Sequence, residues 1–180
     1  MEQKVNEYTI TAFSENAVGL LNRITIIFTR RHINIESLTV SASAIKGVHK
    51  FTIVVNTTEA MIIKVTRQIE RLVEVLKAYY HTDEEIVHQE MALYKVPAHI
   101  LTENDAMEKI YRKYGASLIS MTDQFAVIQM TGHREETQEL FARLEPYGVL
   151  QFTRSGRIAV NKDTRELLSE YLDQWEAEQD

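Results

Sequence analysis

The sequence predicts an α+β protein built from two small two-layer units, each with helices on one face of an antiparallel sheet. Three observations support this prediction. Short segments with alternating apolar residues recur along the chain, segments with helical apolar spacing lie between them, and the order βαββαβ occurs twice. A chain of 180 residues has room for one large domain or two small ones.

The first unit is expected to run strand, helix, strand, strand, helix, strand. Its elements are expected as a strand at residues 5–13, a helix that starts near 14–16 and ends near 31, strands at 33–42 and 50–56, a helix from 57 or 58 to 72, and a strand at 73–80. His32 is expected to end the first helix in a left-handed conformation, which histidine tolerates better than most residues other than glycine.

The second unit repeats this order less regularly, and both units are expected to be ferredoxin-like. Its elements are expected as a strand at residues 91–98 ending near Pro97, a helix at 104–114 followed by Gly115, a hairpin of strands at 118–121 and 125–131, a helix at 135–144, and a strand at 149–160 interrupted at 155–156. The expected domains are residues 1–82, a linker at 83–90, a second domain at 91–162 and an acidic helical tail at 163–180.

Composition argues against several classes of protein. Lys and Arg number 20 against 26 Asp and Glu, and the net charge of −6 disfavours a nucleic-acid binder, whose affinity depends on neutralising phosphates. The absence of cysteine removes disulfides and thiolate nucleophiles. No apolar run approaches the ~18 residues that span a membrane, and no signal-peptide pattern opens the chain, so a cytoplasmic protein without membrane contact is expected.

The chain carries no recognisable catalytic or metal-binding motif. It has no phosphate-cradling Gly-Lys-Ser/Thr loop, nucleophile elbow or dinucleotide fingerprint. None of its six histidines pairs with another at metal-ligand spacing on a helix. We therefore expect no catalytic residue, no metal and no enzyme activity in this chain alone.

Residues 14–40 contain the strongest candidate for a binding site. Gly19 falls in the first turn of the expected helix, where free N–H groups and the positive end of the helix dipole attract a carboxylate or phosphate. Asn16 and Asn34 can each donate and accept hydrogen bonds, so they suit both ends of a zwitterion. The alternative is ordinary structure, with Asn16 as a helix cap, Asn34 as a turn residue and Gly19 as a packing position.

The expected strand at 33–42 carries apolar residues on both faces. Ile35 lies on one face, whereas Leu38 and Val40 lie on the other. Either something covers the second face or an edge, which we slightly favour, or a bulge shifts the register. Glu36 on this strand is expected to have a hydrogen-bonding or interface role rather than a catalytic one.

Three motifs carry a resemblance to a known family: Glu15-Asn16-x-x-Gly19-x-Leu21-x-Arg23, Phe28-x-x-Arg31, and Asn34-Ile35-Glu36-Ser37-Leu38-Thr39-Val40. They resemble the ACT domain of the small regulatory subunit of acetolactate synthase, also called acetohydroxyacid synthase. The resemblance continues through residues 72–76, 90–93 and 152–156 and covers residues 7–160. The chain departs from the family at His32-Ile33, where Gly-Tyr is frequent, and this difference bears on pocket shape.

The resemblance implies a non-catalytic subunit that forms a homodimer through its ACT domains and activates a separate catalytic large subunit. That large subunit would carry thiamine diphosphate, magnesium and FAD, and would act as a transferase in branched-chain amino acid biosynthesis. Feedback inhibition by valine, or by leucine or isoleucine, would act through an effector site between the paired ACT domains. By motif position the effector contacts would be Asn16, Gly19 and Asn34, with Leu21 and Ile35 nearby.

Two alternatives remain open from the sequence. The chain could be a free-standing ACT-type amino-acid sensor that acts on another metabolic enzyme or on a regulator. It could also be an RNA-binding βαββαβ module with Tyr8 or Phe51 as stacking platforms, although the acidic balance weighs against this.

Overall fold

The computed structural model describes residues 4–102, 109–110, 112–164, 168 and 170. The chain divides into two compact units. Unit 1 contains the described residues up to Val87 and those from Arg157 onward, whereas unit 2 contains those from His88 to Gly156. The expected helix at 104–114 lies partly outside the described residues, and the expected tail at 163–180 lies mostly outside them.

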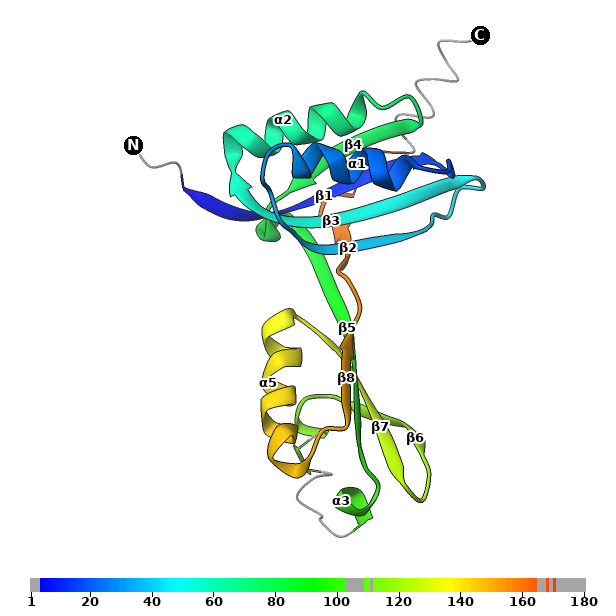
Figure 1. Ribbon diagram of the computed structural model, residues 1–180, viewed down its shortest axis with the longest axis vertical. Coiled ribbons are helices and arrows are strands. Elements are labelled where there is room, and N and C mark those ends of the chain that lie inside the picture. Colours follow the sequence, from blue (N-terminus) through cyan, green and yellow to red (C-terminus); the bar gives the residue numbers. More distant parts are fainter. Residues whose placement is uncertain (1–3, 103–108, 111, 165–167, 169, 171–180) are drawn as a thin grey trace. The chain divides into compact units, whose positions relative to one another are not determined.

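Unit 1 has the expected order, and its strands form one antiparallel sheet in the order β2-β3-β1-β4 (Figure 1). Ile10 and Ile53 of the sheet pack with Ile24 and Ile62 of the helices, and all four are 0% exposed. Both helices therefore cover the same face of the sheet, as the apolar spacing predicts. The elements are β1 (Val5–Glu15), α1 (Leu20–Thr29), β2 (Ile35–Ala42), β3 (Val48–Thr58), α2 (Glu59–Glu70) and β4 (Val75–His81).

The start of α1 differs from the prediction. Strand β1 continues to Glu15, which pairs with Val48 of β3 and whose N–H donates to the Glu74 carbonyl at 2.9 Å. These hydrogen bonds keep residues 14–15 extended, so the helix begins at Leu20 and Gly19, rather than Asn16, is its N-cap. The prediction for His32 is confirmed, because its φ is 54°.

A bulge in β2 explains its apolar pattern. Ile35 pairs with Val55, but Ser37 pairs with Val54, so Glu36 is the extra residue. The bulge brings Leu38 to the same face as Ile35, and both pack against the helix-side core. The pattern of β2 is therefore no sign of a partner surface, and our preference for one over a bulge was wrong.

The other face of the unit 1 sheet is in contact with the chain's own C-terminal segment, β9 (Ile158–Asn161). The Nη1 of Arg157, just before β9, donates to the Thr9 hydroxyl on this face at 2.8 Å, and the Lys50 ammonium donates to the Ala159 carbonyl at 2.6 Å. Leu168 packs with Phe13. Segment 157–161 thus belongs to unit 1 of the structure, whereas the expected second domain ran from 91 to 162.

The expected linker at 83–90 contains the boundary between the two units, after Val87, but its residues form regular structure. Residues Asp83–Glu85 form a short 3-10 helix, η1, and strand β5 (Ile86–Pro97) begins directly after it. The N–H of Lys162 donates to the Glu85 carbonyl at 2.9 Å, and β9 pairs with β5. Pairing with β9 therefore keeps the start of β5 extended, although its polar sequence led us to expect a linker there.

Unit 2 repeats the topology, with strands in the order β6-β7-β5-β8. Its hairpin, its second helix and the strand end at Pro97 are confirmed, and Gly115 has a left-handed φ of 65°. Tyr94 and Leu140, both 0% exposed, lie in its core. The further elements are α3 (His99–Thr102), β6 (Ser117–Met121), β7 (Phe125–Gly132), α5 (Arg134–Leu144), the 3-10 helix η2 (Glu145–Tyr147) and β8 (Gln151–Arg154).

Candidate functional site

The loop between β1 and α1 carries Asn16 and Gly19, and both are exposed. Gly19 adopts a φ of 82°, and a Cβ added there would meet nothing within 4 Å, so the space beside it is open. The N–H groups of Leu21 and Asn22 lie in the first helical turn, where no preceding turn supplies acceptors. Among the residues that the structure describes, no side chain caps this helix end. The loop can therefore receive a small anionic group such as a carboxylate.

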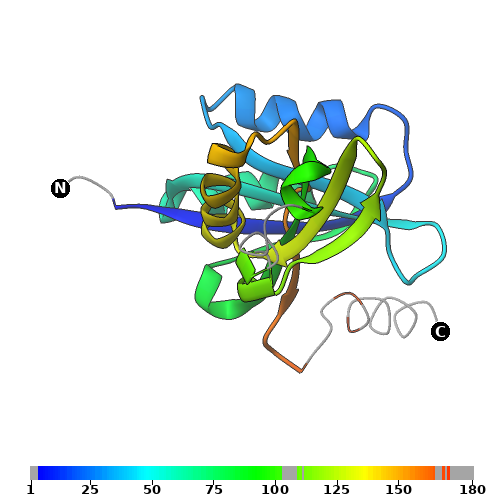
Figure 2. The ribbon, with the colours of Figure 1, turned by 90° about the horizontal axis from the view of Figure 1, so that it is seen from below.

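Asn34 and Ile35 lie at the other end of α1, where the chain enters β2. Asn34 is exposed, whereas Ile35 is partly buried against the helix-side core. The ten residues of α1 span about 15 Å at 1.5 Å per residue. Figure 2 shows the two ends of this blue helix on opposite sides, with the β1–α1 loop at one end and the turn into β2 at the other. Within one chain, the predicted contacts therefore do not converge.

The sheet topology explains this separation. Strands β1 and β2 both run antiparallel to β3, so they run parallel to each other. The β1–α1 loop consequently lies at the end of the sheet where β2 finishes, and Asn34 lies at the end where β2 starts. Strand β2 is an edge strand, and in the described part of the chain no other strand pairs with its outer side.

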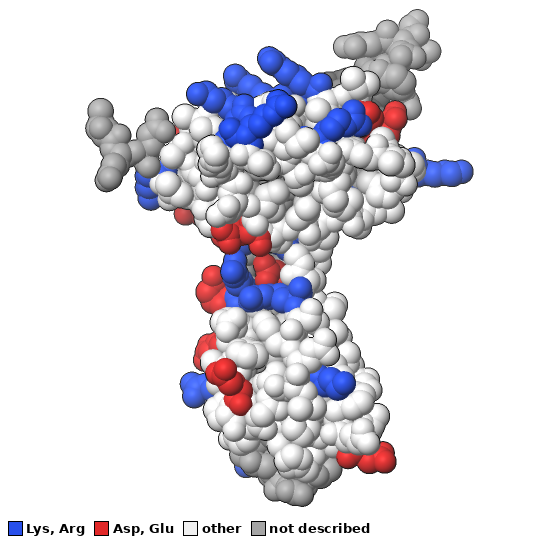
Figure 3. Space-filling model, viewed as in Figure 1, with Lys and Arg blue, Asp and Glu red and all other residues white. Residues whose placement is uncertain are grey.

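An ion pair supports the β1–α1 region. The Arg23 guanidinium bonds the Glu74 carboxylate at 2.5 Å, and this hydrogen bond together with one from the Glu74 backbone holds the pKa of Glu74 below its usual value. Lys and Arg side chains also gather over the helices of unit 1 (Figure 3). The exposed ones are Arg23, Arg30, Lys64, Arg67 and Arg71. The positive charge favours approach of anionic molecules to this layer.

Glu36 occupies the β2 bulge and is exposed. Glu15 lies at the opposite end of the sheet, at the end of β1, so the two acids form no carboxylate pair within the chain. A hydrogen-bonding or interface role for Glu36 stays a prediction.

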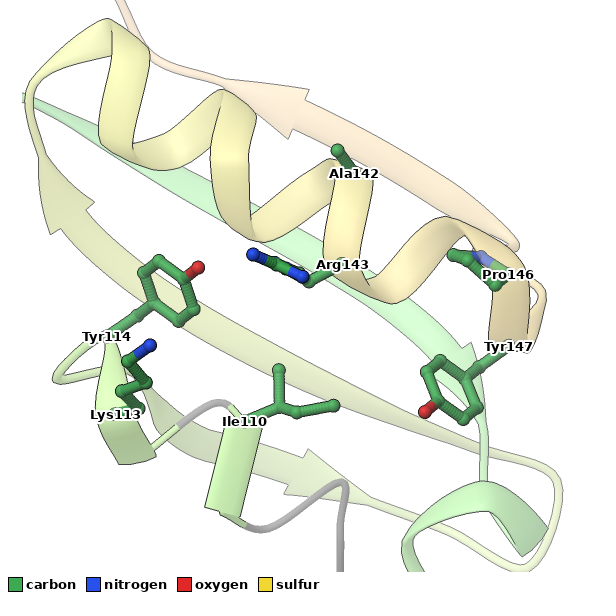
Figure 4. Close-up of a pocket in the computed structure, with 7 residues that line it drawn as sticks. All are labelled: Ile110, Lys113, Tyr114, Ala142, Arg143, Pro146 and Tyr147. Carbon is green, nitrogen blue, oxygen red and sulfur yellow. The ribbon is translucent and has the colours of Figure 1, made fainter.

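A cavity of about 430 Å³ lies in unit 2 and contains none of the predicted site residues. In Figure 4 the Arg143 side chain extends from α5 towards the Tyr114 ring, and Tyr147 lies at the far end. The Tyr114 hydroxyl donates to the Glu139 carboxylate at 2.6 Å. No sequence motif predicts this cavity, because its lining comes from two separate segments: Ile110, Lys113, Tyr114, Ala142, Arg143, Pro146 and Tyr147.

Other features bear on the alternatives. Tyr8 and Phe51 are 3% and 5% exposed and lie in the helix-side core, so neither can stack on a base. Within the described residues, no group of three or more His, Cys, Asp or Glu could hold a metal ion. No helix in the described part of the chain is long and apolar enough to cross a bilayer.

Two regions of the chain match known protein families. Residues 10–77 match the AHAS small subunit-like ACT domain, and residues 89–163 match the small subunit of acetolactate synthase. The two matched regions include the β1–α1 loop, all of β2 and the return segment that begins at Arg157.

Similar proteins carry the same description over most of their length. The acetolactate synthase small subunit of Bacillus subtilis (strain 168) is 35% identical over 161 residues, which cover 89% of this chain and 93% of that protein. That of Mycolicibacterium smegmatis is 30% identical over 158 residues, covering 88% and 92%. The crystal structure of the small subunit from Thermotoga maritima superposes with a TM-score of 0.79 at 26% identity, covering 89% and 99%. The chain therefore belongs to the acetolactate synthase small-subunit family.

Proposed function

We propose that this chain activates a catalytic large subunit of acetolactate synthase and makes it sensitive to feedback inhibition by valine. The large subunit would carry thiamine diphosphate, magnesium and FAD. The observation that carries the proposal is the open, glycine-capped loop at Gly19 together with an unpaired edge at β2, within a chain of this family.

Pairing of two chains would bring together the predicted effector contacts, which lie apart within one chain. If two β2 edges pair antiparallel about a two-fold axis, the start of β2 in one protomer faces the end of β2 in its partner. The β1–α1 loop lies at that end. Asn34 of one protomer would then lie near Asn16 and Gly19 of its partner, and a dimer would contain two equivalent sites.

The chemistry of this composite site suits a free amino acid. The N–H groups after Gly19 would bind the carboxylate, and the two carboxamides would bind the remaining polar atoms. Leu21, which is 45% exposed, and Ile35 would contact an aliphatic side chain. Discrimination between valine and isoleucine should be modest, because one methylene is worth about 1–3 kcal/mol in a fitted pocket.

Calorimetric titration with valine, leucine and isoleucine, combined with activity of the reconstituted enzyme, tests this function. We expect valine to bind, the chain to raise the large subunit's activity, and valine to reverse that increase. A chain that binds a branched-chain amino acid but leaves the large subunit's activity unchanged would favour a free-standing sensor. A chain that does neither would contradict both functions.

Substitution at Gly19 locates the site. Gly19→Asp should abolish inhibition and leave activation intact, because it places a carboxylate where the ligand's own carboxylate would bind. The side chain has room, but the left-handed backbone costs about 1–2 kcal/mol for any residue with a Cβ. Gly19→Asn is therefore the matched control, with the same strain and no charge. Equal inhibition of the Asp variant and the wild type would exclude this site.

A further inference from the structure

We propose that Ser37 and Arg157 link the effector site to the two chain segments that lead into unit 2. This inference rests on the proposed function, since it concerns how occupancy of the β2 site is transmitted. Both residues lie in unit 1, and Arg157 directly follows Gly156, the last residue of unit 2.

Arg157 is the anchor of the return segment. Its side chain is 5% exposed, and its guanidinium bonds the Glu7 carboxylate at 2.5 Å and the Asp83 carboxylate at 3.0 Å. It also donates to the Thr9 hydroxyl at 2.8 Å. One buried cation thus holds three parts of unit 1 together: β1, η1 and the residue before β9.

The same interactions hold both connections to unit 2 at one place. One connection leaves unit 1 through η1 and the start of β5, and the other returns at Arg157. Asp83 of η1 binds Arg157, and Lys162 donates to the backbone carbonyls of Glu84 and Glu85 at 2.8 and 2.9 Å. A displacement of Arg157 would therefore move both connections together.

Ser37 joins this anchor to the effector strand. The N–H of Arg157 donates to the Ser37 hydroxyl at 2.9 Å, and Ser37 is the third residue after Asn34. The pairing of β2 with β3 shifts register between Ile35 and Ser37. At such a bulge the ladder is interrupted, so the backbone at Asn34 can move without breaking the pairing that begins at Ser37. Ser37 is then the first residue beyond the bulge that a movement of the Asn34 backbone would displace.

If Ser37 transmits occupancy of the site, its substitution should leave valine binding intact but remove inhibition of the large subunit. Ser37→Ala removes the acceptor of the Arg157 N–H but no proposed effector contact. We expect the Ser37→Ala chain to bind valine within about threefold of wild type and to activate the large subunit, because the Ser37 hydroxyl bonds Arg157 and is none of the proposed effector contacts. Saturating valine should then inhibit little, since the coupling between sites, roughly 5- to 150-fold in typical cases, is lost.

Two variants control this experiment. Ser37→Thr keeps the hydroxyl and should restore inhibition. Ser41→Ala makes the same change four residues further along β2, at an exposed position, and should behave as wild type. Each full-length chain is titrated with valine by calorimetry and assayed with the large subunit at saturating valine.

The outcomes separate this link from the proposed function. Full inhibition of the Ser37→Ala enzyme at saturating valine would overturn the link. So would a loss of affinity greater than tenfold with full inhibition at saturation, because Ser37 would then be a binding residue. If the wild-type chain neither binds valine nor activates, the proposed function itself fails.

Discussion

The two units share a strand order but differ in how the second face of the sheet is covered. In unit 1, Thr11 and Val54 on this face are 4% and 2% exposed, and the return segment contacts the face. In unit 2, Met91 on the equivalent face of β5 is 44% exposed, and Val127 is partly exposed. The same topology is thus completed in unit 1 by residues that follow unit 2 in sequence. Unit 1 is therefore built from two segments of the chain that are separated in sequence by unit 2.

Core substitutions should show the largest effect and test whether the two cores are independent. Ile24→Ala in unit 1 and Leu140→Ala in unit 2 each truncate a side chain that is 0% exposed, and each should cost about 2–5 kcal/mol. Amide hydrogen exchange should show lost protection mainly in the unit that carries the substitution. Equal loss in both units would mean that the chain unfolds as one cooperative body.

The second largest effect is expected from loss of the Arg157 side chain. Arg157→Ala leaves Glu7 and Asp83 without their cation, and because both acids are partly exposed we expect a cost of about 1–3 kcal/mol in unit 1. The matched control is Arg154→Ala, whose guanidinium bonds Glu90 in unit 2. Exchange protection of β1 and β4 should fall only in the Arg157 variant. Unchanged protection there would show that β9 is not needed for unit 1.

Removal of the Asn34 carboxamide should affect regulation rather than folding. Asn34→Ala should raise the inhibitory concentration of valine roughly 10- to 100-fold, because a hydrogen bond to a charged group is worth about 1.5–3 kcal/mol. Asn56→Ala, at an exposed position of β3, is the control. Dose–response assays of the reconstituted enzyme measure both. Loss of activation with inhibition preserved would contradict the role of Asn34.

The smallest expected effect concerns Tyr94 in unit 2. Its hydroxyl donates to the Thr137 carbonyl at 2.6 Å, and burial raises its pKa from 10.0 to about 12. Because the folded pKa is the higher one, this stabilisation is complete below pH 10 and is lost as pH rises towards about 12. Tyr94→Phe should cost about 1 kcal/mol at pH 7. Urea unfolding at pH 7 and pH 11 should show the difference from wild type shrinking, and a constant difference would contradict it.

Periodicity predicted the elements of both units because each buries one apolar face. It could not place the start of α1, since the extension of β1 to Glu15 depends on pairing with Val48, 33 positions away. It identified a strand near residues 158–160 but not the unit to which that strand belongs. Arg157 gave no signal, because the burial of a lone cation depends on acids brought from β1 and η1.

The candidate site was predictable only in part. The motifs indicate Asn16, Gly19 and Asn34, but their spacing along the chain does not reveal that the length of α1 separates Asn34 from the other two. Their separation follows from the parallel course of β1 and β2, which is a property of the sheet. A second protomer is therefore a requirement of the proposed site.

Mixing two defective chains tests this requirement most directly. Gly19→Asp and Asn34→Ala chains should each bind valine poorly alone. After equimolar mixing and exchange of protomers, a site shared between protomers predicts recovery of about a quarter of the wild-type binding capacity, as random pairing in a two-fold dimer gives. Calorimetry that detects no recovered high-affinity sites, in a mixture shown to contain mixed dimers, would contradict the account.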